Sequence, residues 1–238
     1  MAKKSGGDGI KKSSGRQMRG QQKFVKVKTA KRRTASSTRW LQRQLNDPYV
    51  AEAKKQGLRS RAAFKIIQLD EELDLFHPGM RVVDLGAAPG GWTQVAVQKI
   101  KPEETGGRIV GIDYLEMEDM PGATFLQADF NDHDAPDKLK EALDGKADLV
   151  MSDMAAPTTG HKQTDHLKIM ALVELAYHFA KEVLEQDGIF LAKVFQGGAE
   201  NTLLADLKRD FKKVKHIKPN ASRSDSSEIY VVAIGYRG

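Results

Sequence analysis

Hydrophobic and polar positions follow two different periods along the chain. Short, largely apolar runs predict buried strands at 81–85, 108–113, 123–130, 147–157, 188–196 and 228–235, and a further strand is expected at 213–217. Apolar residues at helical spacing predict helices between some of these strands, at 92–100, 166–184 and 199–210. Strands that alternate with helices predict a doubly wound α/β fold with a mostly parallel sheet. The short connection before the last strand allows that strand to run antiparallel.

The segment before the first strand divides into two parts. Residues 1–37 contain very few apolar side chains, so we expect a disordered basic arm. Residues 38–77 predict a basic helical lobe, which precedes a core over 78–238. In the lobe, Asp47 and Pro48 predict the start of one helix, and Gly57 predicts its end. Ser60 is expected to cap a second helix, which carries Lys65 within an apolar stripe.

Charge is unevenly distributed along the chain. Residues 1–46 hold fourteen Lys and Arg side chains against the single acid Asp8, whereas the remaining residues have a net charge of −7. A basic arm of this kind is attracted to polyphosphate without sequence preference, although a solubilising tail would have the same composition. The charge therefore suggests a nucleic acid partner and does not identify it.

Composition excludes several classes of protein. The 238 residues contain no cysteine, so disulfides and thiolate metal sites are absent, and the six histidines show no metal-binding spacing. No apolar run approaches the length of a membrane span, and the basic amino terminus lacks the apolar segment of a signal peptide. We expect a cytoplasmic monomer that binds neither membrane nor metal.

A glycine-rich turn follows the first strand in the sequence RVVDLGAAPGGWTQ (81–94). Asp84 ends the strand, and the turn spaces Gly86, Gly90 and Gly91 more widely than the dinucleotide pattern G-x-G-x-x-G. Glycines at these positions let a ligand approach the bare backbone. An acid before the wider turn suits a ligand with an amino-acid portion and a sulfonium group.

The string DLGAAPGGW within this segment resembles the FtsJ/RrmJ family of ribosomal RNA 2′-O-methyltransferases. The resemblance implies S-adenosylmethionine as cofactor and a Rossmann-like fold, with a seven-stranded sheet and helices on both faces. It also favours a position for Trp92 on the cofactor side.

Acids at successive strand ends complete the expected cofactor site. Asp113 ends the second strand, where a carboxylate can bind ribose hydroxyls, and Asp129 follows the third, where it can accept from an adenine amino group. The expected cofactor-binding residues are Asp84, Gly86, Gly90, Gly91, Trp92, Asp113, Asp129 and Asp153.

Four ionisable residues are candidates for catalysis. Lys65, Asp153, Lys193 and Glu228 lie in contexts (RAAFK, MSDMA, AKVFQG, SSEIYVVA) that resemble those of the catalytic residues in the FtsJ/RrmJ family. One hypothesis makes Lys193 the proton acceptor for a ribose hydroxyl, with Lys65 favouring its neutral form and the two acids orienting the lysines. A competing hypothesis makes Asp153 the base and leaves Lys193 charged.

The target is implied by resemblance only, as a uridine of 23S ribosomal RNA in the large subunit. The loop after Asp153 departs from the DMAPN pattern of the family, since Pro157 is displaced and the asparagine is missing, which leaves its RNA contact open. Candidates for phosphate contacts are Lys54, Lys55, Arg59, Arg61 and Arg223. Two alternatives remain: methylation of another RNA such as transfer RNA, and a mainly non-catalytic role as an RNA-binding assembly factor.

Overall fold

The structure is a computed structural model that describes residues 24–157, 159–195, 201–224 and 226–238. The helices are α1 (Ala35–Leu45), α2 (Pro48–Lys55), α3 (Ala63–Leu73), α4 (Gly91–Ile100), α5 (Pro102–Thr105), α6 (Ala135–Leu143), α7 (Lys162–Val183) and α8 (Asn201–Asp210). The strands are β1 (Arg81–Leu85), β2 (Arg108–Asp113), β3 (Thr124–Gln127), β4 (Ala147–Ser152), β5 (Leu184–Phe195), β6 (Phe211–Ile217) and β7 (Glu228–Tyr236).

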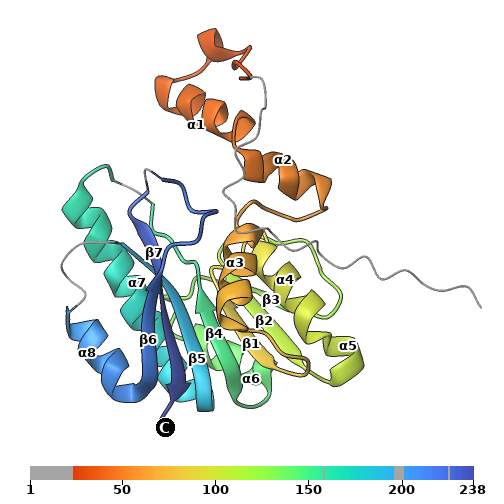
Figure 1. Ribbon diagram of the computed structural model, residues 1–238, viewed down its shortest axis with the longest axis vertical. Coiled ribbons are helices and arrows are strands. Elements are labelled where there is room, and N and C mark those ends of the chain that lie inside the picture. The colour runs from red at the N-terminus through yellow and green to blue at the C-terminus, as the bar shows by residue number, and fades with distance from the viewer. Residues whose placement is uncertain (1–23, 158, 196–200, 225) are drawn as a thin grey trace, which may run out of the picture.

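These strands form one seven-stranded sheet in the order β3-β2-β1-β4-β5-β7-β6. β7 pairs antiparallel with both β5 and β6, whereas the remaining pairs are parallel (Figure 1). The expected mostly parallel sheet with one antiparallel strand is therefore confirmed.

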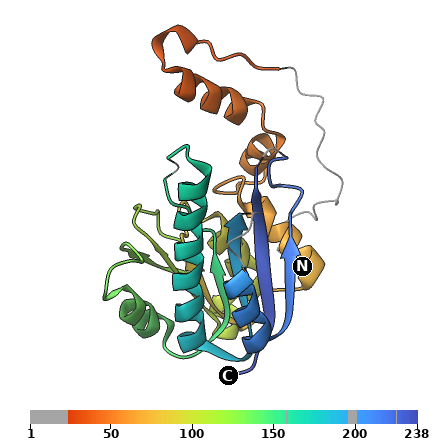
Figure 2. The same cartoon turned by 90° about the vertical axis from the view of Figure 1, so that its left-hand side faces the viewer.

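Helices cover both faces of the sheet because successive strand residues point to opposite sides. Val82 belongs to the apolar cluster under α3 and α4, while its neighbour Val83 belongs to the cluster under α6, α7 and α8. Figure 2 shows α7 running along the second of these faces. The Rossmann-like α/β architecture is thus confirmed. The carboxyl ends of the parallel strands all lie at the same end of the sheet.

The amino-terminal part of the described chain projects beyond this sheet (Figures 1 and 2). α1 begins at Ala35 with Thr34 as its N-cap, and a short 3₁₀ helix precedes it at Ala30–Arg32. The backbone N–H of Val25 donates to the side chain of Asn46, the C-cap residue of α1, at 2.8 Å, and that of Val27 donates to the side chain of Gln42 in α1 at 3.1 Å. Helical structure therefore begins inside the segment expected to be disordered, while residues 1–23 lie outside the described residues.

Several element boundaries differ from the sequence expectation. α3 begins at Ala63 without a side-chain cap, so the expected Ser60 cap is wrong. β5 extends back to Leu184, and α7 begins at Lys162, four residues before the expected start. The sequence analysis placed no helix at α6, although Ala135, Leu139 and Leu143 are buried at helical spacing.

No helix in the described part of the chain combines the length and apolar character that a membrane span requires.

Candidate active site

The four candidate catalytic residues come from four separate elements. Asp153 directly follows β4, Lys193 lies in β5, Glu228 begins β7, and Lys65 lies in α3. Strand pairing sets Lys193 opposite Tyr230 of β7, so this end of the sheet brings polar groups of neighbouring strands together. The backbone N–H of Asp153 donates to the Leu85 carbonyl at 3.2 Å, which ties the end of β4 to the glycine turn after β1.

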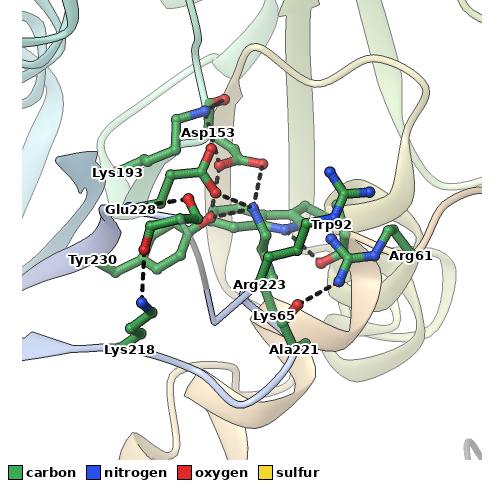
Figure 3. Close-up of polar contacts among 12 residues, drawn as sticks. Arg61, Lys65, Trp92, Asp153, Lys193, Lys218, Ala221, Arg223, Glu228 and Tyr230 are labelled. Carbon is green, nitrogen blue, oxygen red and sulfur yellow. Dashed lines mark hydrogen bonds and ion pairs between the residues drawn. The ribbon is translucent and has the colours of Figure 1, made fainter. Parts of the chain in front are cut away.

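These side chains form one connected cluster, which we call the Lys–Asp–Lys–Glu cluster (Figure 3). Lys65 Nζ lies 3.4 Å from Glu228 Oε2 and 3.8 Å from Asp153 Oδ2. Lys193 Nζ lies 3.3 Å from Asp153 Oδ1 and donates to the Asp153 carbonyl at 2.7 Å. Asp153 therefore lies between the two ammonium groups and contacts both.

Burial makes the charges of the two lysines energetically costly. The two lysines are only 7% and 4% exposed, and a buried ammonium group is costly unless it is paired and hydrogen-bonded. Burial acts to raise the pKa of Asp153, but the charges of Lys193 and Lys65 outweigh it and hold that pKa below its ordinary value. The carboxylate thus stays ionised at neutral pH and balances the lysines.

Tyr230 also belongs to this cluster. Its place in an apolar strand predicts a core position, which its full burial confirms, but the sequence analysis did not indicate that its hydroxyl joins the cluster. Its hydroxyl donates to Asp153 Oδ1 at 2.8 Å and accepts from Lys65 Nζ at 3.0 Å. Burial and then the Asp153 carboxylate raise the pKa of Tyr230 well above its ordinary value, so the hydroxyl keeps its proton. The available signal was the spacing of Glu228 and Tyr230, which places both on one face of β7.

Trp92 lies on the other side of Tyr230, inside the core. The two ring centroids are 5.5 Å apart, and the indole N–H donates to the Ala62 carbonyl at 3.0 Å. Trp92 is 3% exposed and packs within the apolar cluster under α3 and α4. The expected cofactor-side position is therefore not what the structure shows, and Trp92 instead supports Tyr230.

A pocket of about 450 Å³ opens at the carboxyl ends of β1, β2 and β4, and we call it the strand-end pocket. Four of the expected cofactor residues line it: Gly86, Asp113, Asp129 and Asp153. Apolar side chains complete its wall, including Ile112, Leu115 and Phe130. Since Asp153 belongs both to this pocket and to the Lys–Asp–Lys–Glu cluster, a ligand in the pocket lies against the cluster.

Two carboxylates that line the strand-end pocket, those of Asp113 and Asp129, are held by hydrogen bonds from nearby N–H groups. Asp113 accepts from the N–H groups of Ala88 and Leu115 at 3.0 and 2.9 Å. Asp129 accepts from the backbone and side-chain N–H groups of Asn131, which lower its pKa. Carboxyl acceptors beside an apolar wall fit a nucleoside, whose ribose hydroxyls and amino group are donors.

The glycines of the turn also allow close packing against other segments of the protein, which we did not expect. Gly86 has φ +76°, and a Cβ there would lie 2.9 Å from the backbone of Met154. A Cβ on Gly90 or Gly91 would collide with Arg59 or Ser60, so these glycines admit the segment that precedes α3.

Asp84, Gly90, Gly91 and Trp92 are not among the described residues that line the strand-end pocket. Asp84 is 1% exposed and accepts from the Thr93 hydroxyl at 2.6 Å, and its other oxygen, Oδ1, has no hydrogen-bond partner among the described residues. Burial raises the pKa of Asp84 to about 7. Asp84 therefore lies buried behind the glycine turn, with Thr93 as its hydrogen-bond donor.

The loop after β4 contributes to the same pocket. Met154, Ala155, Ala156 and Pro157 all line the strand-end pocket. The departure from the DMAPN pattern therefore falls on the wall of this pocket, in addition to any contact with RNA.

The candidate phosphate-binding residues separate into two groups. Arg59 is fully engaged, because it donates to the carbonyls of Glu118 and Asp119 at 2.8 and 2.7 Å and lies over the Phe125 ring. It braces the loop after β2, which contradicts a free phosphate-binding role.

The remaining candidates lie on the lobe and on the β6–β7 connection. Arg61 Nε and Arg223 Nη2 lie 2.8 and 3.5 Å from the same Asp47 carboxylate oxygen. Lys54 and Lys55 are exposed on α2, and Lys55 forms a 3.8 Å ion pair with Glu52.

Comparison with known proteins identifies the family. The model of FtsJ-like methyltransferases matches residues 58–236. A ribosomal RNA large subunit methyltransferase E from Paramagnetospirillum magneticum is 67% identical over 217 residues, which cover 90% of this chain and 88% of that protein. The relative of the same name from Azorhizobium caulinodans is 65% identical over 214 residues, with 90% and 89% covered.

A crystal structure described as a ribosomal RNA methyltransferase from Plasmodium falciparum has the same fold. It matches with a TM-score of 0.67 at 31% identity and covers 76% of this chain and 99% of its own. The sequence motifs, the seven-stranded sheet and these relatives agree. The chain therefore belongs to the family of FtsJ-like methyltransferases.

Proposed function

We propose that this chain is an S-adenosylmethionine-dependent methyltransferase acting on the ribose 2′-hydroxyl of a uridine in 23S ribosomal RNA of the large subunit. The observation that carries the proposal is the Lys–Asp–Lys–Glu cluster, whose Asp153 also lines the strand-end pocket. The names of the relatives favour large-subunit RNA as the substrate. We expect the enzyme to act as a monomer in the cytoplasm, where ribosomal particles are found.

The strand-end pocket fits the cofactor on the chemistry of its lining. Asp113 would accept from the ribose hydroxyls, Asp129 from the adenine amino group, and the apolar wall at Ile112 and Phe130 would pack on the base. Gly86 would leave the backbone bare beside the amino-acid portion. The bound cofactor would supply a methyl group on a sulfonium, which already has a good leaving group.

Activation of the ribose hydroxyl is then the task of the protein, because this hydroxyl loses its proton only far above neutral pH. We assign proton acceptance to Lys193 Nζ, while the ribose oxygen receives the methyl group in line with the leaving sulfur. Asp153 is a weak base, since its pKa lies below the ordinary value. Glu228 and Tyr230 would hold Lys65 in position beside Asp153.

The test is methyl transfer from radiolabelled S-adenosylmethionine to large ribosomal subunits purified from a strain that lacks the gene. Wild-type enzyme is expected to produce 2′-O-methyluridine in 23S RNA, and Lys193→Ala to reduce the single-turnover rate by about a hundredfold or more. Cofactor affinity, measured by calorimetry without RNA, should change little in this variant. Asp153→Asn in the same assay tests the competing assignment of the base.

Free ribosomal and transfer RNAs incubated in parallel report any other RNA target. Absence of label on every RNA, despite cofactor binding, would contradict the proposal. The non-catalytic alternative predicts instead that Lys193→Ala fully restores growth to the deletion strain.

A further inference from the structure

A second hollow reaches the Lys–Asp–Lys–Glu cluster from the side away from the strand-end pocket. Its volume is about 400 Å³, and its lining includes Lys65 and Glu228. The strand-end pocket contributes Asp153, which contacts Lys65 at 3.8 Å. The cluster therefore forms the wall between two hollows, one with nucleoside-binding character and one without an assigned ligand.

This second hollow continues outward into a larger groove. The groove has a volume of about 1150 Å³ and lies between α1, the start of α2 and the β6–β7 connection. Both hollows are lined by Arg43, Arg61 and Arg223, so they form one continuous path from the lobe to the cluster. We call this path the basic groove.

Charge along the basic groove is strongly positive. Its outer part is lined by four arginines, Arg39, Arg43, Arg61 and Arg223, against the single carboxylate of Asp47. That carboxylate is only 7% exposed and already contacts Arg61 and Arg223, so it neutralises one of the two guanidinium charges beside it. Within the described part of the chain, neither Arg39 nor Arg43 forms an ion pair with a carboxylate, and we conclude that the groove favours an anionic occupant.

Arg61 and Arg223 are not equivalent within the groove. Arg61 donates to the Ala221 carbonyl at 2.6 Å and stacks over the Tyr49 ring, so it holds the β6–β7 connection against the lobe (Figure 3). The Arg223 side chain is 32% exposed, and Arg43 is exposed on α1. These two guanidinium groups are the ones available to a ligand.

An aromatic side chain lies beside these cations. Phe24 lines the outer groove and is 67% exposed. Exposed aromatic rings next to arginines are typical of single-stranded nucleic acid sites, where bases stack on rings and phosphates contact the cations. A folded duplex does not present unstacked bases in this way.

We infer that the basic groove binds the single-stranded RNA backbone that flanks the methylated ribose, with Arg43 and Arg223 as phosphate-binding residues. RNA would thus enter from the side of α1 and the β6–β7 connection and meet the cofactor only across the Lys–Asp–Lys–Glu cluster. This inference rests on the proposed function, because RNA as substrate is part of that proposal. It assigns the RNA path to one residue of the lobe and one of the β6–β7 connection, neither of which lines the strand-end pocket.

The test measures binding of a fluorescein-labelled oligouridylate to the full-length protein by anisotropy over a range of KCl concentrations. Arg43→Gln, Arg223→Gln and the double variant are compared with wild type. Arg237→Gln is the matched control, because Arg237 is an exposed arginine after β7 and lines neither part of the groove. The basic arm is present in every protein, so its contribution cancels.

The double variant is expected to bind about tenfold more weakly, and the slope of log Kd against log salt should fall by about 0.7 for each phosphate that the variant no longer neutralises. Melting temperature and cofactor affinity should match wild type. If Arg223→Gln lowers the melting temperature, Arg43→Gln alone carries the test, because its side chain projects from an exposed position.

Wild-type affinity and slope in the double variant would overturn the inference, as would an equal loss of affinity in Arg237→Gln. Binding needs no methyl transfer, so the two proposals fail separately. Groove-dependent binding without methylation of any RNA would contradict the proposed function and leave the groove in place.

Discussion

Asp84 is a carboxylic acid enclosed at the end of β1, behind the glycine turn. Burial raises its pKa to about 7, and the carboxylates of Asp153 and Asp113 add to the shift in the same direction. The folded protein therefore holds this proton more tightly than the unfolded chain, whose ordinary pKa is 3.8. Stability from this residue is complete below pH 3.8 and is lost progressively as the pH rises to about 7.

We predict that Asp84→Asn removes this pH dependence. Between pH 5 and pH 8 the wild type should lose about 2 kcal/mol of unfolding free energy relative to the variant, since each pKa unit corresponds to about 1.4 kcal/mol. Urea unfolding at several pH values measures this difference directly. Parallel stability curves for the two proteins would show that Asp84 is ionised in the folded state throughout.

The roles of Tyr230 and Arg59 depend on contacts with other segments of the chain. A tyrosine in an apolar strand has the sequence pattern of a core residue, yet its hydroxyl joins Lys65 to Asp153. An arginine beside a basic helix has the pattern of a phosphate ligand, yet Arg59 holds three carbonyls of two other segments. The core position of Tyr230 is confirmed, but the role of its hydroxyl and the contacts of Arg59 were not predicted, because the partners are distant in sequence.

At the scale of elements, one buried carboxylate fixes the end of α3, the helix that carries Lys65. Asp70 is 5% exposed, and its Oδ1 accepts from the backbone N–H groups of Leu75 and Phe76 at 2.9 and 3.0 Å. Its Oδ2 lies 2.7 Å from Lys99 of α4. One carboxylate therefore ends α3, turns the chain toward β1 and links two helices on the same face of the sheet.

We predict that Asp70→Ala destabilises the protein by about 2 to 4 kcal/mol, because two buried backbone donors are left without their acceptor. Asp70→Asn keeps an acceptor oxygen and removes only the ion pair with Lys99, so its destabilisation should be less than half as large. Glu72→Ala, on the exposed side of α3, is the control and should change stability by less than about 0.5 kcal/mol. Chemical denaturation measures all three, and equal destabilisation in Asp70→Ala and Glu72→Ala would refute this role.

The presence of most strands and helices follows from the local sequence pattern, but the residues at which they begin and end do not. The seven strands and the glycine turn correspond to expected segments because buried strands are marked by apolar runs. The start of α3 was misplaced because Ser60 packs on Gly91 instead of capping the helix. α6 was missed because its stripe is short and lies among acidic and basic residues.

At the scale of the whole molecule, the excess positive charge lies in the amino-terminal segment, and the core is acidic. Residues 1–23 carry seven Lys and Arg against Asp8, so they contribute all of the chain's net charge of +6. Such a segment would accelerate and strengthen encounter with polyphosphate without selecting a site. The basic groove, in contrast, lies directly beside the Lys–Asp–Lys–Glu cluster.

We predict that removal of residues 1–23 raises the KM for large subunits severalfold and reduces its salt dependence, with kcat and melting temperature unchanged. Steady-state methyl transfer at several KCl concentrations measures both parameters. A full-length variant with these seven basic residues changed to Gln is the control for chain length and should behave like the truncation. If the charge-free arm behaves like wild type, the attraction has another origin.

The sequence by itself determined the seven strands, most of the helices that flank them, the glycine turn and the identity of the acids and lysines at the strand ends, because these depend on local periodicity and residue type. Only the tertiary structure decided that Tyr230 completes the cluster, that Trp92 and Arg59 serve the scaffold, and that the lobe and the β6–β7 connection enclose a groove. Those features arise from contacts between segments far apart in the chain. These contacts form only when the strands of the sheet are paired in register.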